Sequence, residues 1–194
     1  KDSITVSIGH TTANYETARK AFEKGATHVT HLFNAMPSFS HRDTGVIGAA
    51  FDMPDTQVEL ICDGVHVSET MIRAAFQLFT DNRVVLVSDS MMAAGCPDGE
   101  YTLGGQSVTV KGKLATLHDG TIAGSVTNLA DCFRYAVSIG IPVESALKAV
   151  TINPARAIGI DKDYGSIASG KIANLLILDS NLHIKAIIFH GKIL

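Results

Sequence analysis

Four apolar segments of the sequence carry, near or just after their carboxyl ends, side chains that can bind a metal ion or transfer a proton. In chain order these are His10, His31, Asp63 with His66, and Asp89. Parallel α/β folds carry their chemistry at the carboxyl ends of the strands, so this order predicts that the groups meet at one rim. Neutral imidazole binds zinc and related divalent ions, and a carboxylate with a free oxygen can accept a proton from water. The residue types therefore suit metal-dependent hydrolysis, although catalytic zinc usually has three protein ligands and two histidines are one short.

Other polar residues have simpler structural interpretations. Asp63 precedes Gly64, which favours a turn over a metal ligand. His28 lies an odd number of residues from His31, so on a strand it points to the opposite face and is interpreted as structural. The remaining histidines fall in loops or late strands and are expected on the surface: His41, His118, His183 and His190.

Two further catalytic motifs are incomplete. Residues 165–172 match most of a phosphate-binding loop, but Ile172 stands where that loop needs Ser or Thr, and a strand pattern follows instead of a helix. Ser90 and Ser125 lack the G-x-S-x-G context of a hydrolase nucleophile. We therefore expect a surface turn at 165–172 and no serine nucleophile.

The elements that must position the candidate residues alternate between strand and helix in the first half of the chain. Helices are expected over 13–24, where Gly25 ends the apolar stripe, and after Ser68, which is expected to cap its helix. Strands separated by helices predict right-handed crossovers and a parallel sheet. The expected strands are 4–8, 27–33, 58–62 and 84–87.

The second half of the chain changes character. Apolar stripes predict one helix around 129–136 and another around 146–150. A third short helix is expected with Asn153 as its cap, Pro154 at its first position and Gly159 as its end. Short β segments are expected on both sides of these helices, at 101–103, 107–110, 114–117, 175–178 and 184–189.

The composition describes a well-cored globular protein, because 46% of the 194 residues are hydrophobic and 18% are charged, with a formal net charge of −3. These values exclude disorder, and 19 acidic against 16 basic residues exclude a nucleic-acid binder with a basic surface. No apolar run approaches the roughly 20 residues that span a bilayer, so no membrane partner is expected. The sequence opens without Met or a signal peptide, and we expect it to be cut from something longer. The widely spaced Cys62, Cys96 and Cys132 predict reduced thiols in a cytoplasmic protein.

Short motifs along the whole chain resemble those of the N-acetylglucosamine-6-phosphate deacetylases, a family within the amidohydrolase superfamily. The motifs are Gly-His-Thr at 9–11, Thr-His-Leu-Phe-Asn-Ala-Met at 30–36, Asp-Gly-Val-His at 63–66, Ser-Asp-Ser at 88–90, Thr-Ile-Asn-Pro-Ala-Arg-Ala at 151–157 and Gly-Ser-Ile at 165–167. Each motif is short, but their order and spacing together are specific.

The resemblance implies an α/β fold, namely half of a metal-dependent (β/α)8 TIM-type barrel plus the C-terminal strands of a small β-sandwich domain. The residue pattern alone leaves an alternative, because a closed barrel typically needs about 250 residues and a flavodoxin-like open sheet fits the length better. The predicted division is 1–100 for the C-terminal half of the barrel with four strand–helix units, 101–124 for a β-rich insertion, 125–160 for helices that pack on the barrel, and 161–194 for strands of the sandwich domain.

The resemblance also assigns metal-binding and catalytic roles. His10 and His31 match the two histidine ligands of a divalent metal ion, with zinc favoured and iron, cobalt or manganese as alternatives. Asp89 matches the catalytic aspartate, which takes a proton from the hydrolytic water and passes it to the departing amine. The family's metal-ligating glutamate and its carbonyl-polarising histidine belong to the half that precedes this sequence.

The substrate contacts follow from the same comparison of motifs. Asn34 and the backbone of Ala35 match groups that hold the sugar phosphate, and His66 matches a substrate-binding histidine. Arg42 matches an arginine that reaches the phosphate bound by the neighbouring subunit, so a homodimer is expected. Ile122 lies where the family has an apolar substrate contact, with a looser alignment.

The implied activity is hydrolysis of the acetamide of N-acetylglucosamine 6-phosphate, which gives glucosamine 6-phosphate and acetate. A deacetylase of another hexosamine phosphate, such as the galactosamine isomer, is the alternative within the same class. From a different class comes a catalytically incomplete segment or binding module, since one metal carboxylate and half of the barrel are missing. We expect the 194 residues alone to be inactive.

Overall fold

Four parallel strands form the central sheet of the computed structural model, which describes residues 4–194. They are β1 (Ser7–Ile8), β2 (His28–Val29), β3 (Gln57–Ile61) and β4 (Val84–Val87), and their order in the sheet is β1-β2-β3-β4. A flavodoxin-like sheet reverses its strand order at a switch point. The observed order has no reversal, and each strand lies beside the next one in the chain, as in a barrel.

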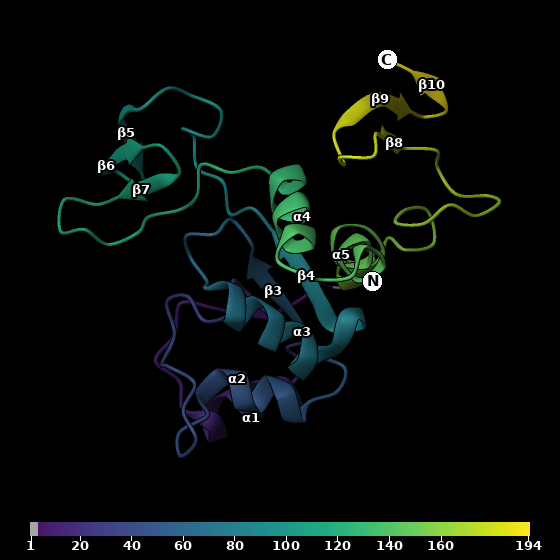
Figure 1. Cartoon of the computed structure of the whole chain (residues 1–194). Helices are drawn as coiled ribbons and strands as arrows, with labels where there is room; N and C mark the ends of the chain where they lie inside the picture. Colours follow the sequence, from purple (N-terminus) through teal and green to yellow (C-terminus); the bar gives the residue numbers. More distant parts are fainter. Residues whose placement is uncertain (1–3) are drawn as a thin grey trace.

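Three helices lie on one side of the strands (Figure 1): α1 (Tyr15–Glu23) and α2 (Gly45–Asp52) pack against each other, and α3 (Glu69–Arg83) packs against β3 and β4. Two more, α4 (Leu129–Ser138) and α5 (Val143–Val150), contact β4, and the short α6 (Ile152–Ala157) follows. The main core lies between these layers. Val58 and Leu60 of β3 are fully buried in it together with Ile72 and Phe79 of α3. Alternate residues of the strands thus face the helices.

The helix α2 is absent from the sequence prediction. Its first six residues are buried, and its apolar side chains surround the helix on every side. Six consecutive buried residues show no amphipathic stripe, and Gly45 and Gly48 lower the local helix propensity. Periodicity therefore gave no signal at this place.

The bounds of two predicted strands and two predicted helix caps are wrong. The strands predicted at 4–8 and 27–33 are much shorter in the structure, because the chain leaves the sheet just beyond Ile8 and Val29. Ser68 occupies the N-cap position of α3, but its side chain makes no capping hydrogen bond. Asn153 lies inside α6, where its buried amide donates to the carbonyls of Asp81 (2.7 Å) and Val84 (2.8 Å) and ties the helix to the end of α3.

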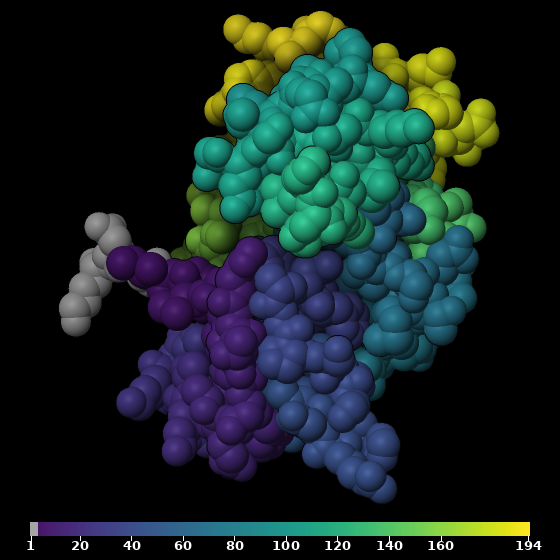
Figure 2. Space-filling model, turned by 90° about the vertical axis from the view of Figure 1, so that its left-hand side faces the viewer, coloured from purple at the N-terminus to yellow at the C-terminus, as the bar shows by residue number. Residues whose placement is uncertain are grey.

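Two small antiparallel sheets stand on either side of α4 (Figure 1). One contains β5 (Gly99–Leu103), β6 (Gln106–Lys111) and β7 (Leu114–Thr116), and it has a small core of its own around Val108 and Ala115. The other contains β8 (Leu175–Leu178), β9 (Ile184–Phe189) and β10 (Lys192–Ile193). Figure 2 shows the first of these sheets, in teal, above the purple and blue N-terminal part of the chain.

The predicted strands of the second half are confirmed, and so are its three helices. The expected surface turn at 165–172 is confirmed as an irregular, mostly exposed segment. The division into regions 1–100, 101–124, 125–160 and 161–194 stays a prediction, and residues 1–3 of the first region lie outside the described residues. No helix within 4–194 combines the length and apolar character needed to cross a membrane.

Candidate active site

The structure brings His10 and His31 together at the ends of β1 and β2. Ile8 pairs with Val29, and each histidine follows its strand by two residues, so the register places the two side chains at the same level. Gly9 permits this approach, because a Cβ atom there would lie 2.7 Å from Cβ of Thr30. The two imidazole rings stand 4.6 Å apart between centroids, with their planes at 72°.

The backbone at the candidate residues is left-handed. His10, His31 and Asp89 have φ angles of 43°, 31° and 49°, and Ala35 has a φ of 49°. This conformation costs a residue with a side chain about 1–2 kcal/mol, and such residues cluster at functional sites where the surrounding structure holds them in place. Four candidate residues therefore share a backbone strain that no sequence pattern predicts.

The buried Ser125 holds the loop that carries Asp89 through three hydrogen bonds. The N–H of Ser125 donates to the carbonyl of Asp89 (2.9 Å), and the carbonyl of Ser125 accepts from the N–H of Met91 (2.8 Å). The hydroxyl of Ser125 donates to the carbonyl of Ser88. Ser125 therefore has a structural role, while Asp89 is exposed just beyond the end of β4.

Asp63 and His66 form a buried pair in the turn after β3. One carboxylate oxygen of Asp63 accepts the N–H groups of Val65 (2.8 Å) and His66 (2.9 Å), and the other lies 2.7 Å from Nδ1 of His66. Burial raises the pKa of the Asp63 carboxyl, but these hydrogen bonds outweigh it and hold the pKa below its usual value. The turn interpretation of Asp63 is confirmed, and Nε2 of His66 forms no hydrogen bond within the described residues.

We expect the substitution Asp63→Asn to remove part of the stability of the fold in a pH-dependent way. A carboxyl whose pKa is lowered by folding contributes stability above its unfolded value of about 3.9, and the contribution is lost as the pH falls through the folded value. Loss of the charge-assisted hydrogen bonds should lower the free energy of unfolding by about 1–3 kcal/mol at pH 7. Urea unfolding at pH 7 and below pH 4 measures this difference.

The matched control for this experiment is Asp119→Asn. Asp119 is an exposed aspartate whose pKa is lowered by hydrogen bonds from the backbone and side chain of Thr121. Because solvent screens the charge of this fully exposed carboxylate, Asp119→Asn should change the unfolding curve much less than Asp63→Asn at pH 7. A gap between Asp63→Asn and the parent protein that stays constant down to the acid range would contradict the expected role of the Asp63 charge.

Asn34 and Ala35, in the turn after β2, form hydrogen bonds with the segments that carry His31 and His10. The amide of Asn34 donates to the carbonyls of His31 (3.2 Å) and Leu32 (3.1 Å), and the carbonyl of Ala35 accepts the N–H of Thr11 (3.1 Å). His10 and Ala35 line a cavity of about 420 Å³. Its other lining residues lie within or directly after the motifs at 9–11 and 30–36, and this position in the sequence is the signal that could have identified them: Thr11, Thr12, Met36 and Pro37.

Arg42 and Ile122 do not join this cavity. Arg42 is exposed in the loop before α2, and it forms no hydrogen bond or ion pair with any residue of the described chain. Ile122 is half-exposed and pairs with Thr116 in an antiparallel bridge beside β7. The described chain therefore leaves both side chains free to meet another molecule.

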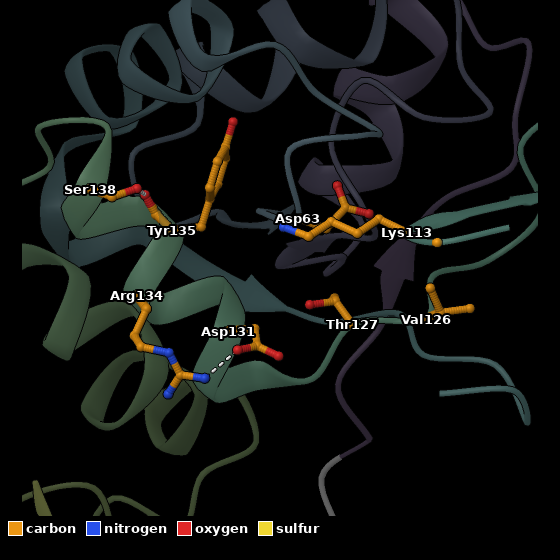
Figure 3. A pocket seen from close by; sticks show the side chains of 9 residues that line it. Asp63, Lys113, Val126, Thr127, Asp131, Arg134, Tyr135 and Ser138 are labelled. Atoms are coloured by element: carbon orange, nitrogen blue, oxygen red, sulfur yellow. Dashed lines mark hydrogen bonds and ion pairs between the residues drawn. The ribbon is translucent and has the colours of Figure 1, made fainter. Parts of the chain in front are cut away.

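A second cavity of about 390 Å³ lies between the turn after β3, the β6–β7 turn, and α4 with the segment before it (Figure 3). Its lining includes Asp63, but none of the other candidate residues. The cation of Arg134 is paired with Asp131 there, as the dashed line marks. This cavity is therefore separate from the two histidines.

The histidine pair fits part of a metal centre. Nδ1 of His31 is buried and has no hydrogen-bond partner within residues 4–194, which leaves this imidazole available as a ligand. Residues 4–194 hold no cluster of three or more His, Cys, Asp or Glu side chains suited to a metal ion. The chain thus offers two of the three protein ligands that a catalytic divalent ion usually takes.

The cysteines do not offer an alternative nucleophile at this site. Burial raises the pKa of the Cys62 thiol to about 12 and that of Cys132 to about 11. A thiol must ionise to attack, so both stay unreactive near neutral pH. Cys96 is exposed, and all three are free thiols.

Comparison with known proteins gives one consistent result. The sequence profile of the amidohydrolase family matches residues 2–194. The chain is 39% identical to the N-acetylglucosamine-6-phosphate deacetylase of Bacillus subtilis, over 99% of this chain and 49% of that protein. It is 35% identical to the N-acetylgalactosamine-6-phosphate deacetylase of Escherichia coli O157:H7, over 100% of this chain and 51% of that protein.

Solved structures agree with the sequence comparison. The crystal structure of N-acetylglucosamine-6-phosphate deacetylase from Pasteurella multocida superposes with a TM-score of 0.93 at 35% identity, over 98% of this chain and 50% of the other. The same enzyme from Thermotoga maritima gives a TM-score of 0.93 at 36% identity, over 98% and 52%. The chain spans about half the length of the relatives it matches.

Proposed function

Because this chain belongs to the amidohydrolase family, we propose that the complete protein is a metal-dependent deacetylase of N-acetylglucosamine 6-phosphate. The observation that carries the proposal is the convergence of His10 and His31, whose rings lie 4.6 Å apart beyond two adjacent parallel strands. The high similarity to deacetylases of N-acetylated hexosamine phosphates supports the substrate class.

The proposed architecture is the C-terminal half of a (β/α)8 barrel with strands of a small sandwich domain. The sequential strand order supports it, and so does the stagger of the strand ends. β2 and β3 pair up to Val29 and Val58, while β3 and β4 continue to Ile61 and Val87, so the second pair ends roughly 10 Å further along. The tilt of barrel strands brings such staggered ends to one rim.

A divalent ion at His10 and His31 would polarise the acetyl carbonyl and lower the pKa of a water molecule. The third protein ligand is proposed to come from the half of the relatives that this chain does not cover. In this site Asp89 takes a proton from the attacking water while a C–O bond forms at the carbonyl carbon. Asp89 then gives the proton to the amine as the C–N bond breaks, so the products are acetate and the free amino sugar phosphate.

The substrate is proposed to lie with its phosphate near the turn after β2. Asn34 and the backbone of Ala35 contact the sugar phosphate, and Nε2 of His66 faces the substrate because Nδ1 is held by Asp63. Ile122 supplies an apolar contact. Arg42 of one subunit is proposed to reach the phosphate bound by the other subunit of a homodimer.

We expect Arg42→Ala to raise KM about 10- to 100-fold while kcat changes little. A charged hydrogen bond to phosphate is worth about 1.5–3 kcal/mol, and this contact binds substrate and transition state alike. Arg42→Lys should fall between the two, because an ammonium lacks the planar fork of the guanidinium. Steady-state kinetics measure both constants.

Arg19→Ala is the matched control, since Arg19 is a surface arginine paired with Glu23 on α1. It should leave both constants near those of the parent protein. A drop in kcat with unchanged KM in Arg42→Ala would contradict a phosphate-binding role.

The experiment that tests the proposed function measures acetate release by the complete protein from N-acetylglucosamine 6-phosphate and from the galactosamine isomer. A higher kcat/KM on the glucosamine substrate supports the proposal, and a higher value on the isomer favours the second candidate, for which the 35% identical Escherichia coli enzyme argues. Release from neither substrate would overturn the deacetylase assignment. The 194 residues alone should release no acetate, since they carry two of the three expected ligands.

The proposed compartment is the cytoplasm. All three cysteines are free thiols, and Cys62 and Cys132 are buried at positions where they serve packing. Free thiols are typical of proteins in a reducing compartment.

A further inference from the structure

We propose that Glu59, in the middle of β3, is a positioning residue that holds His31 in its ligand conformation, with His28 as the partner that fixes the Glu59 carboxylate. This inference rests on the proposed metal-binding role of His31. Neither Glu59 nor the Glu59–His28 contact has a role in the site described so far.

One carboxylate joins β2 to the turn that follows it. Oε2 of Glu59 accepts the backbone N–H of His31 (3.2 Å), and Oε1 lies 3.1 Å from Nε2 of His28. A carboxylate only accepts hydrogen bonds, so His28 carries its proton on Nε2 and donates it. The side chain of Glu59 thus ties the first residue of β2 to the residue where the chain leaves the sheet.

The hydrogen bonds of the neighbouring residues explain why the N–H of His31 needs the Glu59 carboxylate as its acceptor. The N–H of Thr30 donates to the carbonyl of Ile8 on β1 (2.9 Å), and the N–H of Leu32 donates to the carbonyl of Glu59 on β3 (2.8 Å). Between them, His31 has a φ of 31° and its N–H turns to the carboxylate of Glu59. Glu59 therefore holds residue 31 through its side chain and residue 32 through its main chain.

The contact has a direct consequence for the imidazole. A left-handed backbone is unfavourable for a residue with a Cβ atom, and it persists only where the surroundings hold it. Without the carboxylate, the N–H of His31 would lose its acceptor in a site where His31 is 6% exposed. The backbone would then relax and carry the ring away from His10.

The burial of His28 supports its assignment as the partner of Glu59. The residue is 6% exposed, and Nδ1 has no hydrogen-bond partner within residues 4–194. Its hydrogen bond to Glu59 is therefore the contact that orients the ring. The sequence interpretation of His28 as structural holds, and the structure adds that it supports the residue that positions His31.

The test compares Glu59→Ala and Glu59→Gln with the parent in the complete protein, using Co²⁺ as the probe. Co²⁺ affinity is measured by competition with a chelator, and the d–d absorption spectrum reports the geometry of the bound ion. We expect Glu59→Ala to lower the affinity about 10- to 100-fold, as is usual when support for a ligand is removed, and to change the spectrum. Glu59→Gln should lose less, because its amide oxygen can still accept from His31.

Asp81→Ala is the matched control. Asp81 is also a carboxylate that joins two elements, since Oδ2 accepts from Nζ of Lys148 (2.9 Å) and from the hydroxyl of Ser145 (3.3 Å). It lies at the end of α3 that precedes β4, so it should lower the midpoint of urea unfolding without changing Co²⁺ affinity or the spectrum.

The outcomes separate this inference from the proposed function. Unchanged affinity and spectrum in both Glu59 variants would overturn the inference, and so would an equal loss in Asp81→Ala. If Glu59→Ala does not fold, the inference is judged on Glu59→Gln alone: a loss of Co²⁺ affinity supports it, and unchanged affinity and spectrum overturn it. If the Glu59 variants weaken Co²⁺ binding but the parent releases no acetate, the inference stands and the deacetylase assignment falls. If the parent protein binds no Co²⁺, both fall.

Discussion

Replacing Asp89 with Asn in the complete protein is expected to lower kcat by about 10²- to 10⁴-fold, the usual contribution of a general acid–base group. Asparagine keeps the size of the side chain and tolerates the left-handed backbone, with its φ of 49°, that Asp89 adopts. It cannot accept a proton from water or return one to the amine. Metal content should stay the same, because the proposed ligands are His10 and His31.

The measurement pairs acetate release with metal analysis of the same sample. Asp98→Asn is the control, since Asp98 follows β4 in the same stretch of chain and accepts the N–H of Gly112 (2.9 Å). It should keep kcat near that of the parent. Unchanged turnover in Asp89→Asn would remove Asp89 from the mechanism, and loss of metal would make it a ligand.

Replacing His31 with Asn is expected to lower kcat/KM at least about 100-fold, because loss of a ligand exceeds the 10- to 100-fold effect of losing support around one. Asparagine again suits the φ of 31° at this position, so the backbone is left in place while the imidazole is removed. The purified variant should hold less than one equivalent of metal, and excess Zn²⁺ should restore part of the activity. His10→Asn should behave in the same way.

His41→Asn is the matched control, since His41 is an exposed histidine in the loop before α2. It should keep full metal content and activity. Wild-type metal content in both His10→Asn and His31→Asn would contradict the proposed centre, even if activity were lost.

Local periodicity was enough to predict most of the elements. The predicted strand at 84–87 matches β4, and the helix predicted over 13–24 appears as α1, which Asn14 caps by accepting the N–H of Thr17 (3.0 Å). The helix α1 has one buried and one exposed face, so its apolar stripe records its environment. The strand β4 is buried along most of its length, and a short continuous apolar run rich in Val indicates such a strand. The helix α2 shows the limit, because an element buried on all sides has no pattern of this kind.

For the candidate site, the sequence predicted the residue types, and the structure determined how they are arranged. The sequence by itself determined which residue types follow which strands, and hence that His10, His31, His66 and Asp89 are candidates. Only the tertiary structure decided that Ile8 pairs with Val29, which brings His10 level with His31. The pairing register of strands that are distant in sequence depends on the packing of the whole sheet, and no local pattern records it.

The contact between Glu59 and His31 is also decided by the tertiary structure. A glutamate in a strand whose neighbours are apolar gave no functional signal, since its two hydrogen-bond donors lie 28 and 31 residues away in the chain. The left-handed φ of His31 is likewise set by hydrogen bonds to two neighbouring strands. The sequence therefore determined the chemistry available at the rim, and the tertiary structure decided its geometry, because backbone strain is sustained only by contacts that form when the sheet is assembled.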